Sequence, residues 1–218
     1  MKPRIPNQRT AALTLVEVLV IIVVLFVLAV LLLPEFARVK GHAQSQCMNN
    51  LKQVGLAYHV WANDHGGKFP MQLSATNGGA MEQTANGKNP CLVFQVMSND
   101  IVDPKLLWCP ADKGLVAATN WTTGISAKNV SCFVGLDAAT NHPKMFLSGD
   151  DNFAVRGVPV KSGLLEFSTN AAIAWTAKRH VDAGNIGFAD GSVAQTIQSL
   201  LRQLPVQTGV ATNRLAIP

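Results

Sequence analysis

The amino-acid sequence predicts an α+β fold in which one long N-terminal helix, with a transmembrane half and an amphipathic half, packs on a small antiparallel β-sheet head. Three observations lead to this prediction: an apolar run over residues 13–33, a helical repeat of apolar residues after it, and alternating apolar residues around an Asp-Gly pair near the end of the chain. The chain has 218 residues, which suits one globular domain and an additional element.

The apolar run from Leu13 to Leu33 contains only two polar residues, Thr14 and Glu17. A helix of this length spans about 32 Å, which matches a hydrocarbon core of about 30 Å. Residues 1–12 contain basic residues and no acidic one, so the positive-inside rule predicts that this end stays in the cytoplasm. We therefore expect a transmembrane helix over 13–34, a single pass through the cytoplasmic (inner) membrane, and the rest of the chain in the periplasm.

Two simpler explanations of the run fit less well. A cleaved secretory signal usually has about 7–15 apolar residues and a small-residue cleavage site, and no such site follows this run. A plain single-span anchor does not explain Glu17. A carboxylate in lipid costs free energy, so its presence there indicates a functional residue.

A third explanation comes from a resemblance. Residues 12–17, Ala-Leu-Thr-Leu-Val-Glu, resemble the Gly-Phe-Thr-Leu-Ile-Glu motif of type IV pilins and type II secretion pseudopilins. The resemblance implies that a prepilin peptidase cuts between Ala12 and Leu13 and methylates the new N-terminus. It also implies that assembly uses four residues, with the last pairing with the N-terminal amine of a neighbouring subunit: Thr14, Leu15, Val16 and Glu17. Because that peptidase prefers Gly, Ala12 in place of Gly bears on the efficiency of cleavage.

Beyond residue 34 the pattern becomes amphipathic. Apolar residues recur every three or four positions and form one helical face. They are Val39, Ala43, Cys47, Leu51, Val54, Tyr58 and Trp61. The segment 64–67, Asp-His-Gly-Gly, is a strong stop signal, so the amphipathic continuation of the helix should cover 35–63.

Three further segments resemble pseudopilin-like proteins of planctomycete and verrucomicrobial type. These segments are the helix at 47–53, the Trp-Cys-Pro-Ala-Asp segment at 108–112, and a prepilin-type His-x9-Asp-Gly motif formed by His180, Asp190 and Gly191. The resemblance covers most of the chain and implies a pilin-like head.

The head is expected over 64–204, with a loop at 71–90 and a loosely structured tail at 205–218. Short apolar stretches predict strands at 92–97, 132–136, 145–148, 164–168 and 171–176. Residues 184–197 read as a hairpin, because Asp190-Gly191 between alternating apolar residues is a strong turn signal. Asp190 is thus interpreted as a turn residue, and His180 as the donor or acceptor of a structural hydrogen bond.

The four cysteines allow three sets of pairings, between which the sequence does not choose. We favour a disulfide between Cys91 and Cys109 or between Cys109 and Cys132, and treat Cys47 as a small buried apolar residue. No Cys-x2-Cys pair is present, so no zinc site is expected. Asp150 and Asp151 are weak calcium candidates; a polar turn is the favoured interpretation, and no cofactor is assigned.

These observations favour a structural subunit that a prepilin peptidase processes and that assembles into a type II secretion pseudopilus or a type IV-like filament. Its expected partners are copies of itself or other pseudopilins and the inner-membrane secretion platform. The sequence contains no basic stripe with interleaved aromatic residues, so nucleic-acid binding is not expected. No catalytic motif is found, so the chain is not expected to be an enzyme. The alternatives are a membrane-anchored extracytoplasmic ligand-binding module, with a carbohydrate as one ligand, and a secreted hydrolase on an anchor.

Overall fold

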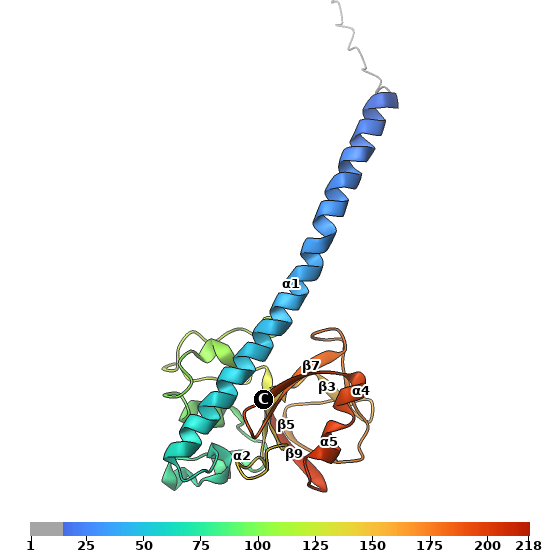
Figure 1. Cartoon of the computed structure of the whole chain (residues 1–218). Helices are drawn as coiled ribbons and strands as arrows, with labels where there is room; N and C mark the ends of the chain where they lie inside the picture. Colours follow the sequence, from blue (N-terminus) through green and yellow to red (C-terminus); the bar gives the residue numbers. More distant parts are fainter. Residues whose placement is uncertain (1–14) are drawn as a thin grey trace, which may run out of the picture. The chain divides into compact units, whose positions relative to one another are not determined.

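The computed structural model describes the backbone of residues 15–218 and the side chains of residues 15–30 and 43–218 (Figure 1). The chain divides into two compact units at Gly41 and His42. Helix α1, Leu15–Asp64, has 50 residues and contributes to both units. It ends where the sequence predicts a stop, because Gly66 and Gly67 adopt positive φ values of 64° and 75° and the N–H of Gly67 donates to the carbonyl of Ala62.

The prediction of a transmembrane helix over 13–34 is contradicted. Within the residues that the structure describes, no helix combines the length and the apolar character needed to cross a membrane. The prediction of a single-pass inner-membrane protein with a periplasmic head is contradicted on the same ground.

Nine β-strands form two antiparallel sheets in residues 42–218. The larger sheet has six strands in the order β5-β9-β1-β2-β7-β8, and the smaller has three in the order β4-β3-β6. The strands are β1 Cys132–Gly135, β2 Phe146–Asp150, β3 Phe153–Val155, β4 Val158–Pro159, β5 Gly163–Ser168, β6 Ile173–Trp175, β7 Ala183–Phe188, β8 Val193–Ile197 and β9 Thr212–Ile217.

Among the described residues, short helices lie between α1 and β1 and between β8 and β9. The four short α-helices are α2 Met81–Thr84, α3 Cys91–Val96, α4 Gln198–Leu201 and α5 Leu204–Gln207. The three 3-10 helices are η1 Pro70–Gln72, η2 Ala75–Asn77 and η3 Pro104–Leu107. The segment 71–90, expected as a loop, therefore contains short helical turns.

Two apolar cores lie on opposite faces of the six-stranded sheet. Successive residues of one strand alternate between them: Val134 belongs to the core that includes α1 and α3, whereas Phe133 belongs to the core shared with the smaller sheet, α4 and α5. Leu147 and Phe146 divide in the same way. This is the period-two alternation of a sheet buried on both faces.

The predicted face of α1 is confirmed from Cys47 to Trp61; Ala43 is half-buried, and the side chain of Val39 lies outside the described residues. Cys47, Leu51, Val54, Tyr58 and Trp61 are all buried. The last four belong to the core that α1 shares with one face of the six-stranded sheet. Figure 1 shows this C-terminal part of α1 and the pair α4 and α5 in the same head, with the sheet between them.

The predicted fold class is nevertheless wrong. The prediction was one small sheet packed on a helix with a membrane half. The structure instead has two sheets, and the six-stranded sheet forms the centre of the second unit.

Two local predictions are wrong for identifiable reasons. Residues 92–96 belong to α3 instead of a strand, because Pro90 presets a helical φ before a run whose period is ambiguous. The tail at 205–218 is not loose: β9 pairs with both β5 and β1.

A substitution at Gly135 tests how closely the strands of the six-stranded sheet approach one another. A Cβ at this position would collide with the carbonyl oxygen of Phe146 on the neighbouring strand. Gly135→Ala should therefore lower the free energy of unfolding by about 3 kcal/mol, measured by urea denaturation. Gly114→Ala is the matched control, since its Cβ would meet its nearest neighbour at 3.5 Å. Equal midpoints for the two variants would contradict this account of the sheet.

Candidate functional site

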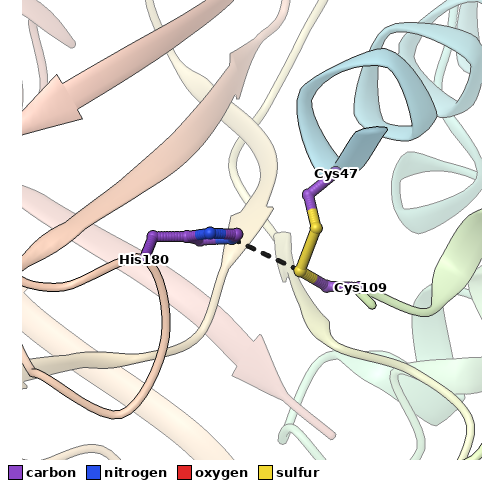
Figure 2. A group of neighbouring side chains, drawn as sticks. All are labelled: Cys47, Cys109 and His180. Carbon is purple, nitrogen blue, oxygen red and sulfur yellow. Dashed lines mark hydrogen bonds between the residues drawn. A yellow bond between two sulfur atoms is a disulfide. The ribbon is translucent and has the colours of Figure 1, made fainter. Parts of the chain in front are cut away.

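Three segments that the sequence singles out meet at one point of the head. Cys47 on α1 forms a disulfide with Cys109, which follows η3. His180, from the loop between β6 and β7, places Nε2 3.3 Å from the Sγ of Cys109. Figure 2 shows the imidazole ring directed at that sulfur atom. The site thus joins the helix segment, the Trp-Cys-Pro-Ala-Asp segment and the His-x9-Asp-Gly segment.

A buried arginine lies beside this disulfide. The side chain of Arg179 is 2% exposed and faces three carboxylates: Nε is 3.4 Å from Asp112, Nη1 is 3.9 Å from Asp150, and Nη2 pairs with Asp151. Nη1 also donates to the carbonyl of Ser131 at 2.8 Å. The guanidinium, which is always charged, therefore binds together segments far apart in the sequence.

Asp150 links the arginine to the histidine. Its Oδ2 is 3.6 Å from Nε2 of His180 and accepts hydrogen bonds from the backbone N–H and the side-chain Nδ2 of Asn185. Burial raises the pKa of Asp150 above its ordinary value, against the opposing effects of Arg179, His180 and Asn185. Burial likewise lowers the pKa of His180, so the ring is neutral at neutral pH.

The backbone around His180 is unusual. His180, Val181 and Asp182 have positive φ values of 52°, 49° and 58°, a region that non-glycine residues seldom occupy. The side-chain amide of Asn152 holds the two ends of this turn, because its Nδ2 donates to the carbonyls of Arg179 at 3.2 Å and Ala183 at 3.3 Å. The left-handed turn brings the side chain of His180 to the disulfide.

The other end of the His-x9-Asp-Gly motif contacts the same helix. Asp190 accepts from the N–H of Ser192 at 2.9 Å and pairs with Lys144, which confirms its place in the turn of the β7–β8 hairpin. A Cβ built on Gly55 of α1 would lie 3.5 Å from the carbonyl oxygen of Gly191. One on Gly191 would lie 3.2 Å from the ring of His59.

This contact gives a physical reason for the spacing of the motif. Strand β7 covers about 20 Å between His180 and Gly191. On α1, Cys47 and His59 are about 18 Å apart. The two ends of the motif therefore meet α1 at two points separated by a comparable length. Between them, a Cβ on Gly187 of β7 would lie 3.5 Å from Leu51 of α1.

The predicted disulfides are not formed. Cys109 pairs with Cys47 instead of Cys91 or Cys132, and the last two are free and buried. Burial raises the pKa of the Cys91 thiol to about 11 and that of Cys132 to about 12, so both thiols stay protonated and unreactive at neutral pH. Cys47 is buried as expected, but it is half of the disulfide.

The calcium candidates have other partners. Asp150 and Asp151 both pair with Arg179, so a cation already occupies the place that calcium would take between them. Among the described residues, the one cluster of at least three side chains with metal-binding atoms is Cys47, Cys109 and His180, whose ligand atoms all lie within 4.8 Å of one another. Thiolate and imidazole are ligands for zinc-like ions, whereas calcium requires oxygen.

The predicted processing and assembly residues are divided between two parts of the chain. Ala12, Leu13 and Thr14 lie outside the described residues. Leu15 and Val16 open α1 and are 81% and 67% exposed. Glu17 is in the first turn of α1, where a negative charge suits the helix dipole.

The chain matched no protein-family model, no curated protein and no solved structure. The assignment to pseudopilins of a type II secretion system is therefore not retained: no family match supports it, and the described residues contain no membrane-spanning helix. The resemblance of residues 12–17 to a prepilin processing motif stays a prediction.

Sequence reasoning missed the central residue of the site. Arg179 precedes His180, and nothing in a lone arginine indicates that it is buried among three carboxylates. Asp112 belongs to the Trp-Cys-Pro-Ala-Asp segment, in which no pattern predicts a role for it. In the sequence, Cys109 and Asp112 are marked only by belonging to the same segment, 108–112; the structure makes them a disulfide half and a buried anion that meet His180 and Arg179.

The disulfide should account for a large share of the head's stability. It closes a loop with a sequence separation of 62, so the chain-entropy model gives about 4 kcal/mol. The double variant Cys47→Ala/Cys109→Ala should have a free energy of unfolding lower by this amount, measured by urea denaturation. A chelator in the buffer keeps metal ions from binding the cysteines. A reductant should lower the unfolding midpoint of the wild type and leave that of the double variant unchanged. An unchanged wild-type midpoint would contradict the assignment.

Proposed function

We propose that the chain is a structural subunit that assembles with further copies of itself through the N-terminal part of α1. A peptidase of the prepilin type would process it between Ala12 and Leu13 before assembly. The observation that carries the proposal is the exposure of the large apolar side chains from Leu15 to Val30, whose exposed fractions range from 43% to 81%.

This apolar surface extends around the whole helix. Four consecutive residues, Ile21, Ile22, Val23 and Val24, are 49% to 61% exposed. Successive residues of an α-helix are turned by about 100°, so these four point to all sides. An exposed apolar surface of this extent marks an interaction site, because leaving it in water is unfavourable.

Copies of the same helix are the occupant that suits this surface. One partner would cover a single side, whereas several parallel neighbours can cover all sides. Aliphatic side chains such as Leu, Val and Ile form the ridges and grooves by which helices pack on one another. The resemblance of residues 12–17 to a processing motif supports the same role, and the proposal assigns the chain no catalytic reaction.

A charge on the helix surface should prevent assembly. Burying an unpaired carboxylate against apolar helices costs several kcal/mol, so Ile22→Asp should weaken assembly at least about 100-fold. The measurement is the molar mass of the full processed chain by light scattering, with negative-stain electron microscopy. Val102→Asp is the matched control, because Val102 is an apolar head residue that is 90% exposed.

The expected result is a large assembly for the wild type and for Val102→Asp, and single chains for Ile22→Asp. Single chains for the wild type, or equal assembly of both variants, would contradict the proposal. Wild-type chains that associate only with a different protein added to the sample would also contradict it.

The processing step has its own test. Co-expression with a prepilin peptidase should yield an N-terminal peptide that starts at a methylated Leu13, detected by mass spectrometry. Ala12→Gly should increase the cleaved fraction, since it restores the residue that the resemblance implies. Without the peptidase the leader should stay intact. An intact leader in the wild type and in Ala12→Gly, both with the peptidase, would contradict processing. Assembly through the helix is tested separately, by the light-scattering measurement.

A further inference from the structure

When the Cys47–Cys109 disulfide is reduced, its two sulfur atoms and the ring of His180 form a set of possible metal ligands. Sγ of Cys47, Sγ of Cys109 and Nε2 of His180 all lie within 4.8 Å of one another. The three ligand residues come from α1, from the segment after η3 and from the turn before β7, so no local sequence motif predicts the set. Figure 2 shows the ring of His180 directed at the sulfur atom of Cys109, which is bonded to that of Cys47.

The atoms around this point are spaced for a small ion. Nε2 of His180 is 3.3 Å from Sγ of Cys109 and 3.6 Å from Oδ2 of Asp150. In tetrahedral zinc sites with bonds of about 2.0–2.3 Å, neighbouring ligand atoms are about 3.3–3.8 Å apart. The Cα atoms of Cys47 and Cys109 are 5.1 Å apart, so both thiolates can reach one ion.

There is also space beside the two sulfur atoms, on a side that His180 does not line. Cys47, Cys109 and Asp150 contribute to the wall of a cavity of about 20 Å³. A cavity of about 10–15 Å³ suffices for one water molecule, so the two sulfur atoms have room to move apart on this side once they are reduced.

The local charge favours a cation once the sulfur atoms are reduced. Arg179 supplies one positive charge to Asp112, Asp150 and Asp151, which together carry three negative charges when ionised. Two thiolates would add two more negative charges to a buried region, where an uncompensated charge is costly. A divalent cation bound by the thiolates would cancel both.

We propose that the reduced chain binds one Zn²⁺ ion through Cys47, Cys109 and His180, with Asp150 beside the fourth position. A thiol reductant gives two electrons and two protons to the disulfide and is itself oxidised to a disulfide, which leaves two protein thiols. Zn²⁺ then displaces one proton from each thiol. Soft thiolates with an imidazole select zinc over calcium or magnesium.

The same residues would then fasten α1 to the head in either redox state. In the oxidised chain the fastening is the covalent Cys47–Cys109 bond. In the reduced chain it is the ion held between the same two sulfur atoms and His180. This inference does not depend on the proposed assembly, because it concerns residues 42–218 alone.

The test uses Co²⁺ as a spectroscopic probe. The full chain is reduced with a dithiol, separated from it by gel filtration without oxygen, and titrated with Co²⁺. The expected result is one Co²⁺ per chain, with thiolate-to-cobalt charge transfer in the near ultraviolet and the visible bands of a tetrahedral ion. Zn²⁺ should displace the cobalt. The oxidised chain should show neither signal, because its sulfur atoms are bonded to each other.

Two histidine variants locate the site. His180→Gln should weaken Co²⁺ binding at least about tenfold. His142→Gln is the matched control, because His142 is exposed, and it should bind as the wild type does. Equal affinity of the two variants would overturn the proposal, and so would binding to the oxidised chain. A reduced wild type that binds no Co²⁺ would overturn it as well.

Discussion

The burial of one positive charge is the constraint on which the head depends. The side chain of Arg179 is buried, and a guanidinium that is removed from water must be surrounded by anions and carbonyls. Asp112, Asp150 and Asp151 supply the anions from two segments, and Ser131 supplies a carbonyl. The loop after η3, the start of β1, the end of β2 and the turn before β7 must therefore come together for the charge to be satisfied.

Local patterns predicted those elements whose signal is local. The buried face of α1 follows from a three-to-four residue repeat, and the β7–β8 hairpin follows from Asp190-Gly191 between alternating apolar residues. The number of sheets could not be predicted, because β9 pairs with two strands, β5 and β1, that lie far earlier in the chain. Residues 92–97 show the same limit, since a short apolar run has no period that separates strand from helix.

The candidate site was predicted in its parts and not as a whole. His180 was assigned a structural contact, and the quoted Trp-Cys-Pro-Ala-Asp segment contains Cys109, but the pairing of Cys109 with Cys47 brings together residues of sequence separation 62. Sequence alone leaves the pairings of four cysteines open. The role of Arg179 depends on three carboxylates that become neighbours only after the sheet has formed.

The left-handed turn at His180, Val181 and Asp182 has a consequence for the order of folding. Each non-glycine residue in that region costs about 1–2 kcal/mol, and the β-branched Val181 is among the least suited to it. An unfolded chain will therefore seldom form the turn by itself, so the turn cannot start the folding reaction. Asn152 and Arg179 can hold the turn only when β2 is already in place. The chain should consequently close this segment late, after the six-stranded sheet has assembled against α1.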